Sequence, residues 1–141
     1  MALTNDSSTT ATTALTQLAQ SEPLRLRIRG NSMLPTLRSG DFVELKAKCC
    51  YLPGDIVAFR HEDNRLLVHR IVGYRPYRSG FYFVAQGDAA SHNDIPQRMS
   101  CIIGRVSNVP VTLMDRVRAG VDFARIVLNA LRRRKAQLSK G

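Results

Sequence analysis

Residue types that together can perform acyl transfer occur in separate short stretches of the chain. Ser32 lies in a Gly-Asn turn ahead of Pro35. A tight turn can present a hydroxyl and leave backbone N–H groups free to hold an oxyanion. His69 lies within an apolar segment, and a neutral imidazole can take a proton from a hydroxyl. These two side chains could therefore act as nucleophile and general base.

Two aspartates could orient that imidazole. Asp88 follows Gly87, and Asp94 lies six residues later in a long polar loop. A carboxylate bonded to the far imidazole nitrogen fixes the tautomer and stabilises the imidazolium. Taken singly, each candidate has an ordinary structural alternative. Ser32 also fits a turn serine, His69 a half-buried strand residue, and either aspartate a turn former.

The segments around these residues predict a mainly β fold. Short stretches of alternating or β-branched apolar residues are separated by Gly, Pro and Asp turn signals. Strands are predicted at residues 24–29, 42–45, 56–59, 66–72, 81–85 and 101–106. Because no helical pattern separates them, a parallel α/β fold is disfavoured. A small β barrel or sandwich with a helical extension is favoured instead.

The last segment changes to a helical period. Apolar residues recur every three or four positions on one stripe, which consists of Leu113, Val117, Val121, Ala124, Leu128 and Leu131. Residues 112–141 also hold eight Lys and Arg against two Asp, which is +6 of the formal net charge of +10. We therefore predict a basic amphipathic helix. Its stripe must bury against the chain's own barrel, a second copy, a partner protein or a lipid surface. Basic segments can also meet nucleic acid, which we expect least here.

The chain divides into four predicted parts. Its 141 residues suit one domain with tails. Residues 1–22 are polar and small and predict a flexible leader. Residues 23–111 form the predicted β domain, 112–135 the basic helix and 136–141 a tail.

Composition narrows the setting in which the protein works. The apolar runs are too short for a membrane span, and residues 1–20 lack the basic start of a secretory signal. The three cysteines are an odd number, which disfavours a secreted disulfide scaffold. No Cys/His spacing resembles a zinc site, and we expect neither metal nor cofactor. We expect a cytoplasmic protein, with peripheral membrane contact through the helix as an option.

Five motifs occur in an order that is similar to a known family. They are Gly30-Asn31-Ser32-Met33-Leu34-Pro35-Thr36-Leu37, Gly40-Asp41, Pro53-Gly54-Asp55-Ile56-Val57, Val68-His69-Arg70-Ile71, and Gly87-Asp88 with the later Asp94. From about Arg29 to Val106 the series resembles the signal peptidase and SOS-repressor (LexA-like) clan of serine peptidases. The resemblance implies a small β barrel of the signal peptidase and LexA C-terminal type, followed here by the amphipathic helix.

The resemblance also implies roles for single residues. Ser32 matches the nucleophile of the Ser-Met-x-Pro box, and Met33 and Pro35 of that box are expected to bind substrate. His69 stands where most bacterial signal peptidases and SOS-type repressors carry a general-base Lys, which resembles the endoplasmic-reticulum and archaeal branch. That branch pairs Ser and His with aspartates at the positions of Asp88 and Asp94. We expect Asp94 to orient the imidazole, with Asp88 as second choice or as a residue that shapes the loop.

One departure from the family affects the oxyanion hole. Many bacterial signal peptidases place a Ser two positions before the nucleophile, where this chain has Gly30. We therefore expect the hole to rest on backbone amides, that of Ser32 among them.

The resemblance implies a signal-peptidase-like serine endopeptidase. It would cleave a leader or short peptide bound as an extended strand along an exposed sheet edge. One alternative is a self-cleaving regulator of the SOS-mutagenesis type whose leader enters its own site, although residues 1–22 contain no Ala-Gly or Cys-Gly bond. Another is a peptide-binding or adaptor module with little turnover.

Overall fold

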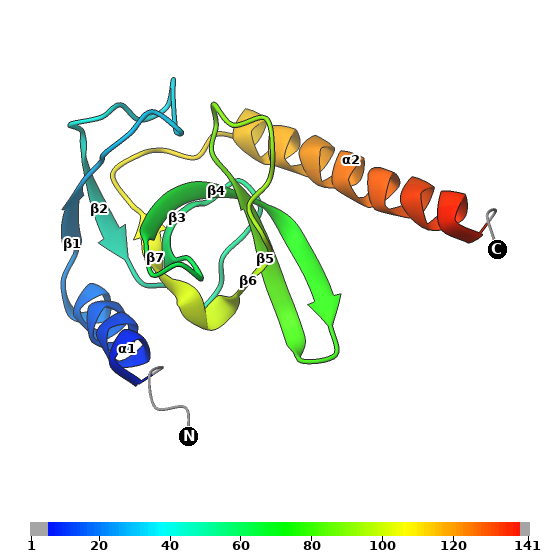
Figure 1. Cartoon of the computed structure of the whole chain (residues 1–141). Coiled ribbons are helices and arrows are strands. Elements are labelled where there is room, and N and C mark those ends of the chain that lie inside the picture. Colours follow the sequence, from blue (N-terminus) through cyan, green and yellow to red (C-terminus); the bar gives the residue numbers. More distant parts are fainter. Residues whose placement is uncertain (1–5, 139–141) are drawn as a thin grey trace.

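The computed structural model describes residues 6–138, which are built on one antiparallel sheet (Figure 1). Its strands are β1 Leu24–Arg27, β2 Phe42–Lys46, β3 Ile56–Arg60, β4 Leu66–Tyr77, β5 Gly80–Gln86, β6 Gln97–Arg98 and β7 Ile102–Val106. A 3₁₀ turn, Met99–Cys101, connects β6 to β7. The strands follow the order β1-β2-β7-β3-β4-β5-β6, and the sheet curls into a half-barrel. The prediction of a mainly β fold with a C-terminal helix is confirmed.

The helix α1, Asp6–Ser21, corrects the prediction of a flexible leader. Leu15 and Ala19 are four residues apart, so they share one face of the helix. Ala19 is buried in the core with Leu15 packed beside it, and its carbonyl accepts a hydrogen bond of 3.1 Å from the Ala47 N–H. The polar composition of this segment predicted disorder, but Leu15 and Ala19 pack the helix against the core of the sheet. Residues 1–5 of the predicted leader lie outside the described residues.

The core lies on both faces of the sheet, and β3 is buried on both sides. Ile56 and Ala58 belong to one apolar cluster, whereas Val57 and Phe59 belong to the other. This division follows from the alternation of side chains along a strand. The first cluster also contains Met33 and therefore anchors the segment that carries Ser32.

The long strand β4 has a different neighbour along each half. Its first half pairs with β3, from Leu66 to Arg70. Its second half pairs with β5, from Arg70 to Tyr77. Residues 66–69 thus have one paired edge and one open edge, and His69 is the last residue of this open stretch.

The helix α2, Leu113–Leu138, packs its first turns against β4 and then extends past the sheet (Figure 1). Ala119 is buried, and the Phe123 ring lies over Gly73 of β4, where any side chain would collide with it. The helix continues three residues beyond the predicted end at residue 135, and residues 139–141 of the predicted tail lie outside the described residues. No helix within residues 6–138 is both long and apolar enough to cross a bilayer.

The face of α2 that packs on the sheet is not the predicted stripe. Leu113 is 77% exposed and Leu128 is 53% exposed. Residues 6–138 of the chain itself therefore do not cover the predicted stripe.

Candidate active site

Ser32, His69 and Asp94 meet beside the open edge of β4. The Nε2 atom of His69 lies 3.1 Å from the Ser32 Oγ, and its Nδ1 lies 2.5 Å from the Asp94 Oδ2. The imidazole is thus bonded on both sides. With its proton on Nδ1 held by the carboxylate, Nε2 is free to accept the serine proton. The His69 side chain is only 10% exposed and that of Asp94 20% exposed, so the hydrogen bond between these two side chains is largely screened from water.

The strands fix the orientation of the imidazole. His69 pairs with Val57 of β3 in the antiparallel register. The Phe59 ring stands edge-on to the imidazole, with centroids 6.3 Å apart and an interplanar angle of 65°. Because Phe59 is fully buried, it provides a rigid wall beside the ring.

The segment that carries Ser32 is a tight turn after β1. Gly30 has φ +88°, a left-handed conformation that glycine adopts without steric cost. The carbonyl of Ser32 accepts a hydrogen bond of 2.9 Å from the Ala89 N–H. The N–H of Ser32 donates no hydrogen bond to any group within residues 6–138. This backbone donor is therefore available to a ligand.

The loop that carries Asp94 is fastened to both β5 and the Ser32 turn. The Asp94 N–H donates to the Ala85 carbonyl at 2.8 Å. Gly87 approaches the Ser32 backbone so closely that a Cβ atom there would lie 2.5 Å from the Ser32 carbonyl oxygen. Only glycine permits this approach, which packs the Asp94 loop directly against the Ser32 turn.

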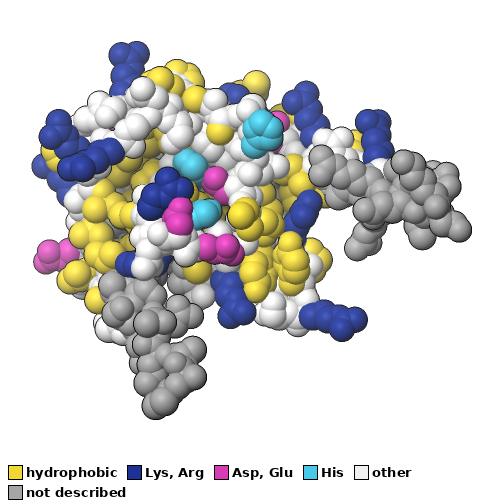
Figure 2. Space-filling model, viewed as in Figure 1, with side chains coloured by type: hydrophobic (Ala, Val, Ile, Leu, Met, Phe, Trp, Pro, Cys, Tyr) yellow, Lys and Arg dark blue, Asp and Glu magenta, His cyan; other side chains and the backbone are white. Residues whose placement is uncertain are grey.

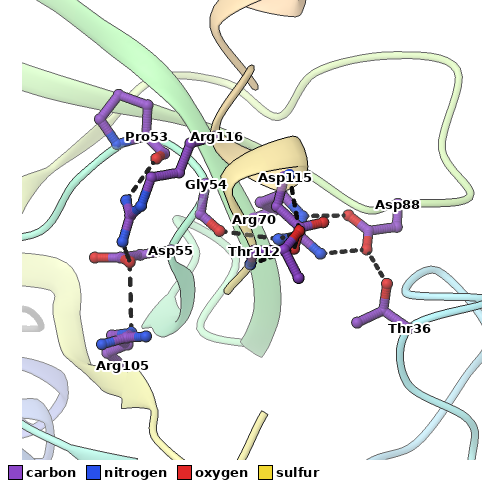
Figure 3. Close-up of polar contacts among 10 residues, drawn as sticks. All are labelled: Thr36, Pro53, Gly54, Asp55, Arg70, Asp88, Arg105, Thr112, Asp115 and Arg116. Atoms are coloured by element: carbon purple, nitrogen blue, oxygen red, sulfur yellow. Dashed lines mark hydrogen bonds and ion pairs between the residues drawn. The ribbon is translucent and has the colours of Figure 1, made fainter. Parts of the chain in front are cut away.

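Asp88, the second candidate, binds a different partner. Its two carboxylate oxygens accept hydrogen bonds of 2.8 Å from the Arg70 guanidinium, and Oδ2 also accepts from the Thr36 hydroxyl at 2.5 Å (Figure 3). The side chains of Arg70 and Asp88 are 8% and 9% exposed. Burial alone would raise the pKa of Asp88, but the hydrogen bonds from Arg70 and Thr36 outweigh it and lower the pKa below its ordinary value. Asp88 is thus an ionised anchor for the Ser32 segment.

Arg70 also connects this anchor to α2. Its guanidinium donates to the Gly54 carbonyl at 2.9 Å and lies 3.5 Å from the Asp115 carboxylate. Asp115 in turn accepts hydrogen bonds from the backbone and hydroxyl of Thr112 at the start of α2 (Figure 3). One buried cation thereby joins the Ser32 segment, the Asp88 loop and the helix.

A second buried carboxylate fixes the helix from the other side. Asp55 is 1% exposed and lies 3.2 Å from Arg116 of α2 and 3.4 Å from Arg105 of β7 (Figure 3). Arg116 also donates to the Pro53 carbonyl at 3.0 Å. The sequence motifs predicted no role for Arg70 or Thr36 and did not indicate these ion pairs. A charged residue inside an apolar strand requires a buried partner, and Arg70 next to His69 was the signal for one.

A cleft of about 270 Å³ borders Ser32 and His69. Residues 26–29 at the end of β1 line one side, and residues 66–69 of β4 line the other. Met33 borders the cleft from the buried core, whereas Pro35 is exposed and does not line it. Figure 2 shows histidine and acidic side chains near the centre of one face, with most basic side chains around its rim. Within residues 6–138, no group of three His, Cys, Asp or Glu side chains is arranged to hold a metal ion.

The half-barrel and the Ser, His and Asp side chains fit the class of serine peptidases. The sequence matches the family described as Peptidase S24-like over residues 3–107, which is more than half of the chain. The chain therefore belongs to this family, the LexA and signal peptidase family of serine peptidases, and the resemblance in its motifs is confirmed. No curated protein matches the chain.

Proposed function

We propose that the chain is a serine endopeptidase with Ser32 as nucleophile, His69 as general base and Asp94 as the carboxylate that orients it. The observation that supports this most strongly is the unbroken hydrogen-bonded series from the Ser32 Oγ through the imidazole to Asp94. The family includes inactive members, and a serine hydroxyl bonded to a general base is what an active serine peptidase needs.

The chemistry is acyl transfer in two steps. His69 takes the Ser32 proton as the Ser32 Oγ forms a bond to the peptide carbonyl carbon. The amide C–N bond then breaks, and the imidazolium returns the proton to the leaving amine. A water molecule, deprotonated by His69, hydrolyses the acyl-enzyme and restores the Ser32 hydroxyl.

The N–H of Ser32 supports the charge that develops on the carbonyl oxygen. It is bonded to no described group, and the Asn31 carbonyl of the same peptide unit accepts a hydrogen bond of 3.2 Å from the Leu34 N–H, so this peptide unit is preorganised. Donors that are already oriented stabilise an oxyanion without reorganisation during the reaction.

Arg70 and Asp88 act as positioning residues. Their contacts reach Thr36 of the Ser32 segment and Asp115 of α2, but the side chain of neither residue bonds to the imidazole. They keep the Ser32 turn in the position in which the Ser32–His69 hydrogen bond can form.

The substrate is an extended peptide, as expected for a signal-peptidase-like enzyme. The cleft lies between β1, an edge strand, and the unpaired edge of residues 66–69 in β4. An extended chain entering there can add a strand to either edge through its backbone. Leu26, Ile28 and Val68 supply apolar side chains along the cleft. We propose leader or short unfolded segments as substrates, in the cytoplasm that the cysteine content predicts.

The position of α1 favours action on another chain over self-cleavage. Residues 6–21 are helical, and Ala19 is buried against the sheet. A segment in this state must leave its docking site and unfold before it can lie in the cleft as a strand.

Hydrolysis of an unfolded protein by the full chain tests the proposal. We expect wild type to cut denatured casein into peptides seen by mass spectrometry, and Ser32→Ala to leave it intact. If wild type instead removes part of its own residues 1–22 at a rate independent of protein concentration, it is a self-cleaving regulator. If wild type binds peptides as tightly as Ser32→Ala and cleaves none, it is a binding module.

A further inference from the structure

The helix α2 has an apolar face that points away from the sheet. We call this face the outer stripe, and its residues are 47–77% exposed: Leu113, Met114, Val117, Val121, Leu128 and Leu131. At about 100° per residue, Ala119 and Phe123 lie on the opposite side of the helix, where they pack on β4. The outer stripe is therefore not a part of the core, and isolated exposed residues do not form such a continuous row.

A row of arginines runs beside the outer stripe. Arg118, Arg125 and Arg132 are exposed and spaced by seven residues, which places them along one line of the helix. The acidic residues of this segment offset only part of the charge of the row. Asp115 is bonded to Thr112 and Arg70 and interacts with Arg118 through its charge, and Asp122 lies 3.8 Å from Arg125.

We propose that the outer stripe and the arginine row dock α2 on the surface of a bilayer that carries anionic headgroups. The stripe enters the boundary between headgroups and acyl chains, and the arginines contact the phosphates. The helix lies in the plane of the surface, since it is not apolar enough to cross the bilayer. This inference does not depend on the peptidase activity.

Charge favours lipid over a second copy as the occupant of the outer stripe. If two copies packed stripe to stripe, their arginine rows would border one interface, and Asp115 and Asp122 of each copy would offset only part of their charge. Like charges at an interface margin oppose association. An anionic bilayer instead offers an apolar layer and negative charge side by side, which matches the two features of the helix.

Sedimentation of the full chain with vesicles tests the proposal. We expect wild type to sediment with vesicles of phosphatidylglycerol and phosphatidylcholine in equal parts, and to stay in solution with phosphatidylcholine alone. Val121→Gln with Leu128→Gln should weaken binding by about tenfold or more, because two apolar anchors are lost while helix propensity is kept. Arg125→Gln with Arg132→Gln should also weaken binding, and added salt should do the same to wild type.

The control is Leu18→Gln, which changes a leucine on α1 that is 56% exposed, close to the 53% of Leu128. It should bind vesicles like wild type. Circular dichroism shows whether each variant keeps its helices. The proposal is wrong if wild type does not sediment with the anionic vesicles, or if the double stripe variant binds them as well as wild type. It is also wrong if sedimentation equilibrium finds a wild-type dimer that the double stripe variant abolishes.

Discussion

His69 and Arg70 are neighbours on β4, and each takes one aspartate from the same loop, yet the two clusters have opposite characters. His69 meets Asp94 beside the cleft, where Asp94 is 20% exposed. Arg70 meets Asp88 in a site where both side chains are less than 10% exposed. Successive strand residues face opposite ways, so a single dipeptide serves two sites.

The two clusters are suited to different roles. Around His69 one imidazole nitrogen is bonded only to a serine hydroxyl, so a proton can move. Around Arg70 the cation is bonded to a carboxylate and a carbonyl and lies near a second carboxylate, so its charge is compensated. Such a buried cluster fixes geometry, because removal of one partner leaves an uncompensated charge. We therefore expect changes at the cleft to alter rate and changes at the buried pair to alter stability.

The largest expected effect is on rate, from loss of the nucleophile or base. Ser32→Ala and His69→Ala should each lower kcat/KM for peptide hydrolysis by about 10⁵–10⁶-fold, because the pair works as a unit. For the same reason the double variant should be no worse than either single variant. Ser32 is exposed, so Ser32→Ala should unfold in urea like wild type. Additive losses in the double variant would contradict the pairing.

A smaller loss of rate should separate the two aspartates. Asp94→Asn should lower kcat by about 10⁴-fold, because an amide cannot hold the imidazole in the required tautomer. Asp88→Asn should lower kcat far less once the rate is corrected for the folded fraction. Steady-state kinetics with circular dichroism on the same samples measures both quantities. Equal losses of kcat in the two variants would show that Asp88 acts in catalysis as Asp94 does, and that the two aspartates do not have different roles.

The free energy of unfolding should depend more on Asp88 than on Asp94, the reverse of the effect on kcat. Asp88→Asn should lower the free energy of unfolding by about 3 kcal/mol, since it leaves Arg70 buried with a weakened partner. The matched control is Asp63→Asn, which removes an exposed carboxylate from its pair with Arg65 and should change stability little. Urea titration of both variants and wild type provides the measurement. A stable Asp88→Asn protein would show that the buried pair is not an anchor.

The smallest expected effect is on the pH dependence of stability. The pKa of Asp88 lies below its ordinary value of 3.8 in the folded chain, so the unfolded chain binds more protons between the two values. The contribution of Asp88 is therefore complete above about pH 4 and declines as the pH falls through the folded-state pKa. Asp88→Asn should lose less stability than wild type over this acid range. An identical decline in the two proteins would contradict an ionised, bonded Asp88.

The sequence motifs predicted the residues beside the cleft better than they predicted the buried ion pairs. The motif order indicated Ser32, His69 and Asp94, and the chain folds so that these three side chains meet. The partner of Asp88 was not predicted, because a bond between residues 70 and 88 depends on how β4 and the loop cross in space. The family resemblance also ranked Asp94 ahead of Asp88 as the partner of the imidazole, and Asp94 is the aspartate that lies beside His69.

The two helices show where periodicity alone is insufficient. The apolar stripe of α2 predicted the helix, but the pattern could not tell which face meets the sheet. That choice depends on Gly73, which leaves room for Phe123. In α1 the polar composition concealed the pair of Leu15 and Ala19, whose burial depends on contacts with β2 and β7, which come much later in the chain.

Covalent labelling is the most direct measurement of the central claim, that His69 activates Ser32. The purified full chain is treated with a fluorophosphonate probe, digested and analysed by mass spectrometry. We predict one adduct on Ser32 in wild type and in Asp88→Asn, and none in Ser32→Ala or His69→Ala. An adduct on Ser32 that forms equally fast in His69→Ala, or no adduct on Ser32 in wild type, would contradict the account.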